Sequence, residues 1–263
     1  MATIYIQLGS GTGAGTLLNP YFYDELGTAE TQAGNGGTIL FTDGTYTLSG
    51  SQTWDGGGFS SMTYKSQNLG GAYLLGATSA RRITVATGTN VATVDGFKTA
   101  NVYFFSGGIF HLNNLSHEDT LTGLSRGSYG FAFGNNNVCT IKNSSVYLIY
   151  DHGSNNRLFN QMDNAIVEGC SFYMSTTATV PSGGVTQYGG SPTTENTIFM
   201  CDTEARASTT LVDPTICTNC CMFQVNETSG GTDNVFADPQ FVDAVTGDLR
   251  LRPSSPCINA GTA

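Results

Sequence analysis

Ionisable side chains gather most densely between residues 151 and 168. Asp151, His152 and Arg157 are followed by Asp163 and Glu168. Two carboxylates held roughly 5 to 9 Å apart can hydrolyse a glycosidic bond. A polar turn whose Asp and His side chains satisfy backbone groups would have the same composition. Because the pattern fits the polar turn better, we predict no catalytic residue and keep the hydrolytic cluster as the alternative.

Two further groups have residue types that bind metal ions. His117, Glu118 and Asp119 are adjacent in what we expect to be an inserted loop, where they would bind a cation or simply be solvated. Cys217 and Cys220 have the C-x2-C spacing of a zinc site, but there is no second pair at finger spacing and no nearby histidine. We therefore expect solvated side chains in the first group, buried cysteines in the second, and no metal or cofactor.

The remaining candidates are arginines and aromatic runs. Arg81 and Arg82 precede a predicted strand and lack acidic partners at matching positions, so we expect surface residues there. The runs 21–23 and 103–105 contain three aromatic side chains each and would suit a sugar. Packing in the core or against the end of the fold is the preferred interpretation for both runs.

A repeated strand pattern must position these groups. Residues 36–48, GGTILFTDGTYTL, hold two short β-branched and aromatic runs separated by Asp43-Gly44. Similar runs recur at intervals of roughly 20 to 35 residues, as expected when each unit is one turn of a solenoid. The recurring runs begin at Met62, Ile83, Val102, Val138, Ala165, Thr197 and Cys220.

One helix is predicted ahead of the first repeat. Asn19 is the expected N-cap, Pro20 the first helical residue and Gly34 the C-terminal stop. The apolar positions between them are Phe22, Leu26, Ala29 and Ala33. An amphipathic helix at this place would cover the open end of a solenoid. Two longer excursions, 113–129 and 175–196, are expected to leave the solenoid as loops.

Composition excludes several classes of function. The 263 residues include 34 glycines, only 11% are charged, and the formal net charge is -10. This charge repels nucleic-acid phosphates and anionic lipid surfaces, so we expect neither partner. The first residues lack the basic and apolar regions of a signal peptide, which predicts synthesis in a cytosol. All seven cysteines are accordingly predicted to be reduced and mostly buried.

The closing stretch carries the most specific resemblance. Residues 236–243 read FADPQFVD, residues 246–251 TGDLRL and residues 255–261 SPCINAG. Together with the helix and the strand repeats, they resemble the right-handed parallel β-helices of the pectate-lyase-like superfamily, in particular virion-associated β-helix proteins of tailed phages. The resemblance implies one all-β domain, 1–263, with an N-terminal strand and capping helix in 1–36, coils in 37–223 and a closing segment in 224–263. The fold specifies function weakly.

The chemistry of that superfamily is not apparent in the sequence. The resemblance would imply carboxylates for calcium beside a proton-abstracting base, or paired aspartates with a Gly-His-Gly turn, and neither constellation is complete. We therefore predict a non-enzymatic structural protein of a phage virion, a capsid decoration, spike or fibre component. Its expected partners are other virion proteins, further copies of itself in a trimer like that of phage spikes, and a host surface glycan. The alternatives are a polysaccharide-degrading lyase or hydrolase and a carbohydrate-binding adhesin.

Overall fold

This computed structural model divides into two compact units, Met1–Ser116 and His117–Ala263. The structure describes residues 2–9, 11–54, 58–76, 81–85, 90–106, 108–121, 129–133, 139–150, 157–160, 164–176, 186–188, 192–202, 216–224 and 230–261. At residues 81–82, 85, 103, 105–106, 119–121, 129–133, 149–150, 157–160, 176 and 186–188 the backbone alone is described. The fold is an all-β parallel solenoid with one short helix near the N-terminus, as predicted. The prediction of a single domain stays a prediction.

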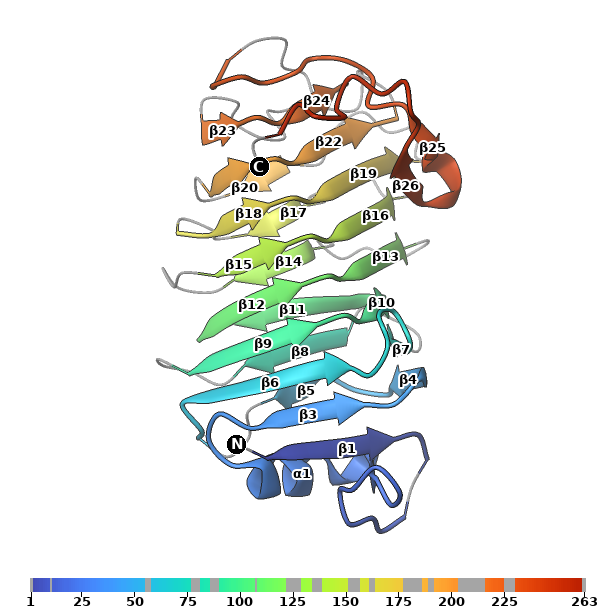
Figure 1. The fold of residues 1–263 in the computed structure, drawn as a ribbon, viewed down its shortest axis with the longest axis vertical. Coiled ribbons are helices and arrows are strands. Elements are labelled where there is room, and N and C mark those ends of the chain that lie inside the picture. Colours follow the sequence, from blue (N-terminus) through green and yellow to red (C-terminus); the bar gives the residue numbers. More distant parts are fainter. Residues whose placement is uncertain are drawn as a thin grey trace. The chain divides into compact units, whose positions relative to one another are not determined.

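Three sheets of parallel strands form the first unit (Figure 1). The first sheet has the order β2-β1-β3-β6-β9-β12, the second β10-β7-β4 and the third β11-β8-β5. The strands of the first sheet are β1 (Thr3–Gln7), β2 (Tyr21–Phe22), β3 (Thr38–Phe41), β6 (Ser61–Ser66), β9 (Val91–Asp95) and β12 (Ile109–Asn113). Those of the second are β4 (Gly44–Leu48), β7 (Ala72–Gly76) and β10 (Lys98–Ala100), and those of the third are β5 (Gln52–Trp54), β8 (Arg81–Val85) and β11 (Val102–Ser106).

One coil consists of three consecutive strands, one in each sheet. The predicted repeat 36–48 supplies β3 and β4, and β5 completes the coil. Thr38 pairs with Thr63 on the next coil, and Ile39 pairs with Tyr64. Because successive side chains of a strand point to opposite faces, Ile39 and Phe41 are fully buried while their neighbours are half-buried. The alternation of apolar residues therefore selects the inner face of each coil.

Aromatic rings fill the interior of the first unit. Trp54 is fully buried, with ring centroids 4.5 Å from Tyr64 and 5.7 Å from Phe41. Phe97 meets Phe41 edge to face at 5.1 Å. Such offset and edge contacts are the favourable arrangements of aromatic rings, and they add to the free energy gained by burying large side chains.

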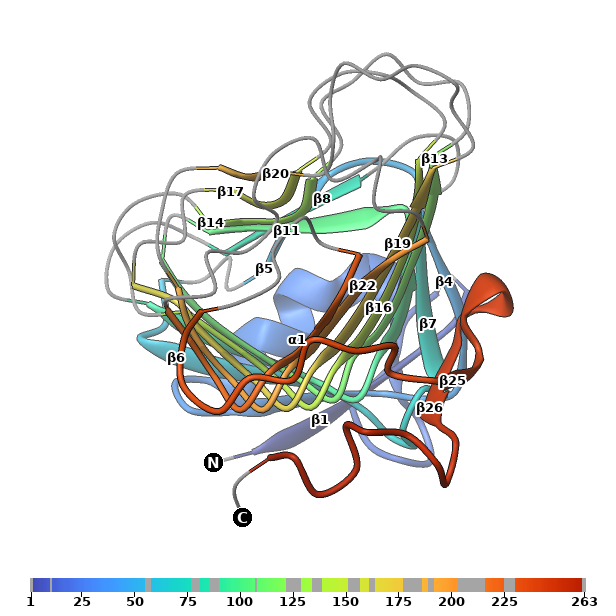
Figure 2. The ribbon, with the colours of Figure 1, turned by 90° about the horizontal axis from the view of Figure 1, so that it is seen from above.

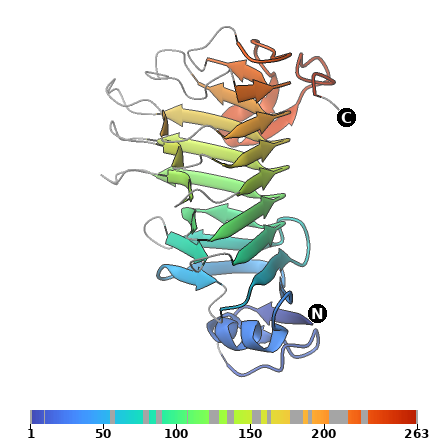
Figure 3. The same cartoon turned by 90° about the vertical axis from the view of Figure 1, so that its left-hand side faces the viewer.

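The helix α1 (Leu26–Ala33) covers the end of the first unit beside β1 (Figure 3). It buries the predicted positions Leu26, Ala29 and Ala33 and stops before Gly34, whose φ of 67° favours glycine. Its predicted start is wrong. Residues 21–22 form β2, and residues 23–25 form a 3₁₀ turn that runs directly into α1. The Glu25 carboxylate accepts the Phe22 N–H at 3.0 Å, so this helical stretch begins after Phe22 and not after Asn19.

Three sheets also make up the second unit (Figure 2). Within this unit the first sheet has the order β15-β18-β21-β23, the second β24-β22-β19-β16-β13 and the third β20-β17-β14. The first comprises β15 (Thr140–Lys142), β18 (Ile166–Glu168), β21 (Thr193–Glu195) and β23 (Cys217–Thr218). The second comprises β13 (Ser116–Leu121), β16 (Ser145–Tyr150), β19 (Ser171–Thr176), β22 (Ile198–Cys201) and β24 (Cys221–Phe223), and the third comprises β14 (Tyr129–Phe133), β17 (Arg157–Asn160) and β20 (Thr186–Tyr188).

A left-handed residue turns each coil from the first sheet into the second. In the second unit these residues are Asn143, Gly169, Asn196 and Asn219, with φ between 50° and 63°. Asn and Gly tolerate this conformation best. Each backbone N–H donates to the next coil, as Asn143 does to Glu168 O at 3.0 Å. The turns therefore join the coils through the backbone.

The chain ends in a segment that we call the strap, residues 236–261. Within it, β25 (Phe241–Asp243) and β26 (Asp248–Leu251) form an antiparallel hairpin around the 3₁₀ turn Ala244–Thr246. The strap lies on the outer face of the second sheet, beside β16, β19 and β22 (Figure 2). Its apolar side chains cover what we call the tyrosine strip, which consists of Tyr147, Tyr173, Ile198 and Met200.

Two predictions about the repeats need correction. The recurring apolar runs are not equivalent positions, since Thr38–Phe41 lies in the first sheet, Ile198–Cys201 in the second and Arg81–Val85 in the third. All three sheets bury alternate residues, so an apolar run does not identify its sheet. The excursions 113–129 and 175–196 are not loops throughout, because they contain β13, β20 and β21. No helix among the described residues has the length and apolarity needed to cross a membrane.

Candidate functional site

The third sheet of the second unit contains Arg157, one residue of the predicted ionisable cluster. Its strands β14, β17 and β20 pair in parallel, with Tyr129 next to Arg157 and Arg157 next to Thr186. Neighbouring strands of a sheet are about 4.8 Å apart, so these three residues form a row along the stack. The register between β17 and β20 shifts after Arg157, which marks a local irregularity at this row.

The predicted cluster divides between two sheets. Arg157 begins β17 of the third sheet, whereas Glu168 ends β18 of the first. Asp151, His152 and Asp163 lie outside the described residues, and in the sequence they flank β17 on either side. Of the five residues, the structure thus places only Arg157 and Glu168, and it separates them by a change of sheet.

Glu168 has a partner that sequence reasoning missed. Its Oε2 atom lies 2.5 Å from Lys142 Nζ, and both side chains are 40% exposed. Lys142 pairs with Glu168 in the register of β15 and β18, so two neighbouring coils hold the ion pair. A lysine and a glutamate at matching positions of two successive coils are the sequence pattern from which this ion pair could have been predicted. An ion pair this exposed contributes little to stability and satisfies the Glu168 carboxylate.

The second candidate group is not in a loop. His117, Glu118 and Asp119 belong to β13, because Ser116–Leu121 pairs into the second sheet. His117 is 1% exposed, and burial lowers its pKa to about 4, so the imidazole is neutral near pH 7. The prediction of a solvated loop is therefore wrong for His117. Within the ranges that the structure describes, no three His, Cys, Asp or Glu side chains are placed to hold a metal ion.

The cysteines are mostly buried thiols, as predicted. Five are free and buried: Cys139, Cys170, Cys201, Cys217 and Cys220. Burial raises the pKa of Cys170 and of Cys201 to about 12, which makes both thiols poor nucleophiles at neutral pH. In contrast, a hydrogen bond from Cys217 lowers the pKa of Cys220, although burial acts in the opposite direction.

The prediction that all cysteines are reduced is wrong for one pair. Cys221 on β24 and Cys257 in the strap form a disulfide. Their Cα atoms lie 6.0 Å apart, a usual separation for bridged cysteines. The sequence signal was Cys257 itself, which stands outside the apolar runs. Because we expected synthesis in a cytosol, where cysteines are reduced, we did not predict a disulfide at Cys257.

The aromatic runs are packing residues where their side chains are described. Tyr23 contacts Tyr46 edge to face at 5.6 Å and lies 6.1 Å from Phe41, at the end of the first unit. Phe104 is fully buried and meets Phe110 at 5.8 Å. Arg81 and Arg82 are the first residues of β8, where they pair with Val102 and Tyr103, and their side chains lie outside the description.

A groove of about 230 Å³ opens between the turns of the second unit and the strap. The turn residues Asn196 and Asn219 line one side, and Leu251, Cys257 and Gly261 line the other. Cys170 and Ser171 also line the groove, but burial raises the pKa of the Cys170 thiol to about 12, and among the described residues no histidine or carboxylate lines the groove to activate either side chain. The groove is therefore a weaker candidate active site than the row on β17.

Comparison with known proteins identifies the fold. No protein-family model and no curated protein matches the chain. Among solved structures, pectate lyase Pel9A superposes with a TM-score of 0.55 at 15% identity, covering 100% of this chain and 92% of the other. Pectin methylesterase PemA from Erwinia chrysanthemi superposes with a TM-score of 0.52 at 11% identity, covering 88% of this chain and 80% of the other.

The chain shares its fold with two enzymes. This finding confirms the pectate-lyase-like β-helix and corrects the prediction of a non-enzymatic protein, which rested on incomplete catalytic motifs. At this level of identity, motifs from known sequences need not be preserved, so their absence was a poor guide. The resemblance to phage proteins has no counterpart among these structures.

Proposed function

We propose that this protein is an enzyme that cleaves a polysaccharide, with its active site on and beside β17. The observation that carries the proposal is the position of Arg157 on β17, in the row on the third sheet. Asp151 and Asp163 precede and follow this strand in the sequence. The sharing of a fold with a pectate lyase and a pectin methylesterase supports the same conclusion. A polymer is a suitable substrate because a row of strands offers a long, repeating surface.

Each residue then has a chemical role to test. Asp151 and Asp163 are the two carboxylates for acid and base or nucleophile steps at the glycosidic bond. Arg157 is suited to bind a carboxylate of an acidic sugar through its planar pair of N–H donors. Glu168 is not assigned to the site, because the Lys142 ammonium group already pairs with its carboxylate.

Product release from purified polysaccharides tests the proposal. We expect new reducing ends or unsaturated ends from at least one member of a panel that includes polygalacturonate, methylated pectin and neutral glucans. Asp151→Asn and Asp163→Asn should each reduce kcat at least about a hundredfold, as expected for loss of an acid or base. Glu168→Gln is the matched control and should retain activity.

Two results would reject the proposal. One is the absence of product from the whole panel with folded wild-type protein. The other is undiminished activity in both aspartate variants, which would move the chemistry away from β17.

We further propose that the enzyme is carried on a phage particle as a homo-oligomer. The acidic, glycine-rich composition and the resemblance of the chain as a whole to virion-associated β-helix proteins support this location. Light scattering of the purified protein at micromolar concentration should report a mass of more than one copy, and we expect that of a trimer. A monomer at all concentrations would contradict the oligomer, and coding neighbours unrelated to capsid or tail proteins would contradict the location.

A further inference from the structure

The strap is attached to the second unit without a shared β-ladder. Among the described residues, β25 and β26 pair only with each other, whereas the other strands of this unit belong to the three sheets of the solenoid. An isolated two-stranded hairpin is marginally stable in water. The position of the strap must therefore depend on side chains and on its two ends.

The side-chain contacts form one small apolar cluster. Phe241 and Leu249 pack on Tyr147 and Tyr173, whose rings stack 5.6 Å apart at 6°. The Tyr147 hydroxyl donates to Val245 O at 2.5 Å. Tyr147, Tyr173, Phe241 and Leu249 are all less than 9% exposed, so the strap keeps the two tyrosines of the strip out of water.

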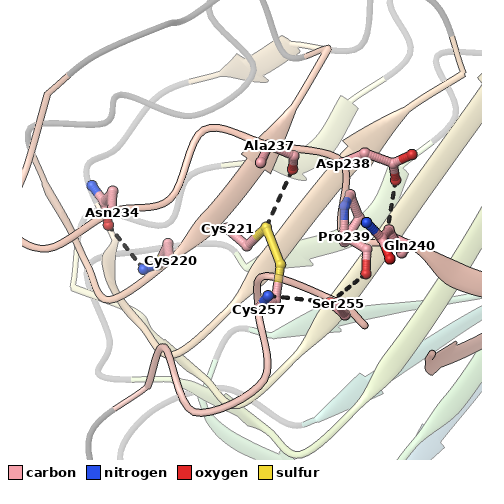
Figure 4. The surroundings of a disulfide bond; sticks show 9 residues. All are labelled: Cys220, Cys221, Asn234, Ala237, Asp238, Pro239, Gln240, Ser255 and Cys257. Atoms are coloured by element: carbon pink, nitrogen blue, oxygen red, sulfur yellow. Dashed lines mark hydrogen bonds between the residues drawn. A yellow bond between two sulfur atoms is a disulfide. The ribbon is translucent and has the colours of Figure 1, made fainter. Parts of the chain in front are cut away.

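Hydrogen bonds within the strap hold its parts together independently of the solenoid. Ser255 Oγ donates to Pro239 O at 2.6 Å, which joins the two sides of the segment (Figure 4). Arg252 donates to Val242 O at 2.9 Å, across the hairpin. These contacts do not involve the solenoid, so moving the strap away from the solenoid would not break them.

The two ends of the strap are fastened differently. Before it, Val235 is built into the last coil, because its N–H donates to Cys220 O and its carbonyl accepts the Met222 N–H, both at 2.8 Å. Near its other end, the Cys221–Cys257 disulfide joins the strap to β24 (Figure 4). The strap is therefore held by backbone hydrogen bonds of Val235 just before its first residue, and by the disulfide near its last residue.

Solvent has a route to this fastening. The groove of about 230 Å³ between the turns and the strap is lined by Cys221 and Cys257. Cys257 is half-buried rather than enclosed. A small thiol can enter such a groove, in contrast to the buried thiols elsewhere in the unit.

We propose that the Cys221–Cys257 disulfide is a reversible fastening, and that its reduction releases the strap as a unit from the tyrosine strip. A thiolate of a dithiol reductant attacks one sulfur, forms a mixed disulfide and frees the other cysteine. The second thiol of the reductant then displaces the remaining cysteine. The reductant leaves as a disulfide, and its two protons and two electrons pass to the two cysteine thiols. Exchange with an oxidised small-molecule disulfide, which takes up the two electrons and two protons and leaves as two thiols, forms the Cys221–Cys257 bond again and closes the strap.

Hydrogen exchange on the full chain tests this directly. Dithiothreitol should accelerate exchange of the amides of β25 and β26 on the order of a hundredfold, the usual effect of one disulfide on an opening equilibrium. Amides of β16 and β19 should keep their protection. Alkylation and intact mass establish that Cys221 and Cys257 are reduced in the same sample.

Variants separate the fastening from general stability. Cys257→Ser should show fast exchange in the strap with and without reductant, and Cys201→Ala, which removes a buried free thiol, should respond as the wild type does. Unchanged protection of β25 and β26 after verified reduction would overturn the proposal. Equal acceleration in β16 and β19 would also overturn it, because the disulfide would then stabilise the whole unit.

Discussion

Buried polar side chains set the pH range in which the second unit is stable. His117 is the clearest case, since burial lowers its pKa from 6.5 to about 4. Between these values the unfolded chain binds a proton that the folded chain excludes, so stability is fully present above pH 6.5 and falls as the pH drops toward 4. The loss from this one group is on the order of 3 kcal/mol.

Replacing His117 should flatten this dependence. Urea unfolding of His117→Gln between pH 7 and pH 4 should lose less free energy of unfolding than the wild type does, because glutamine does not titrate. His111→Gln, at a half-buried position on β12, is the control and should follow the wild type. Parallel curves for the wild type and His117→Gln would show that the buried imidazole does not cause the acid sensitivity.

A second buried contact joins the helix α1 to the strand β6 within the first unit. The Tyr64 hydroxyl donates to Glu30 Oε1 at 2.6 Å, and the Glu30 side chain is 2% exposed. Tyr64→Phe should reduce the free energy of unfolding by about 1 to 3 kcal/mol, the usual cost of leaving a buried polar group without its hydrogen-bond partner. Tyr5→Phe is the control for loss of a tyrosine hydroxyl from the same unit. Equal effects of the two variants would count against a special role for the Glu30 contact.

At the scale of elements, the left-handed turns control how each coil passes from the first sheet into the second. Asn143 has a φ of 50°, a conformation that β-branched residues strongly disfavour. Asn143→Val should therefore cost about 1 to 3 kcal/mol of unfolding free energy, while Asn143→Gly should cost far less. Thermal unfolding of both variants measures the difference. A valine variant as stable as the glycine variant would show that the turn can be rebuilt at little cost.

Local patterns predicted these elements unequally. The strand over Thr38–Phe41 and the stop of the helix at Gly34 were predictable, because alternation and glycine conformation are local properties. The start of α1 was not, because it depends on the Glu25 carboxylate accepting the Phe22 N–H, which begins the helical stretch after Phe22 and not after Asn19. His117 was assigned to a loop because the polar residues around it have no strand pattern. The strand β13 forms through pairing with strands of neighbouring coils.

At the scale of the whole molecule, the cysteines report the attachment of the strap. Labelling of denatured, unreduced protein should find five free thiols, and labelling after reduction should find all seven. Seven free thiols before reduction would show that the disulfide does not form in the isolated protein. This pairing could not be predicted from sequence, because the 36-residue separation of Cys221 and Cys257 is bridged only by the folding back of the strap.

The candidate site was only partly predictable for a related reason. The sequence brought Asp151, Arg157, Asp163 and Glu168 together as one dense group, yet the passage from the third to the first sheet separates Arg157 from Glu168. Which sheet a residue occupies depends on the path of the coil, which no local pattern encodes. The prediction of a non-enzymatic protein gave incomplete motifs more weight than the fold, which the chain shares with two enzymes.

The most direct test of polysaccharide cleavage at β17 is a crystal structure of Asp163→Asn with a bound oligogalacturonide. We predict electron density for the sugar along the row of Tyr129, Arg157 and Thr186, with a sugar carboxylate at the Arg157 guanidinium. Sugar bound only in the groove beside the strap, or no binding in calorimetry at millimolar oligosaccharide, would contradict the account.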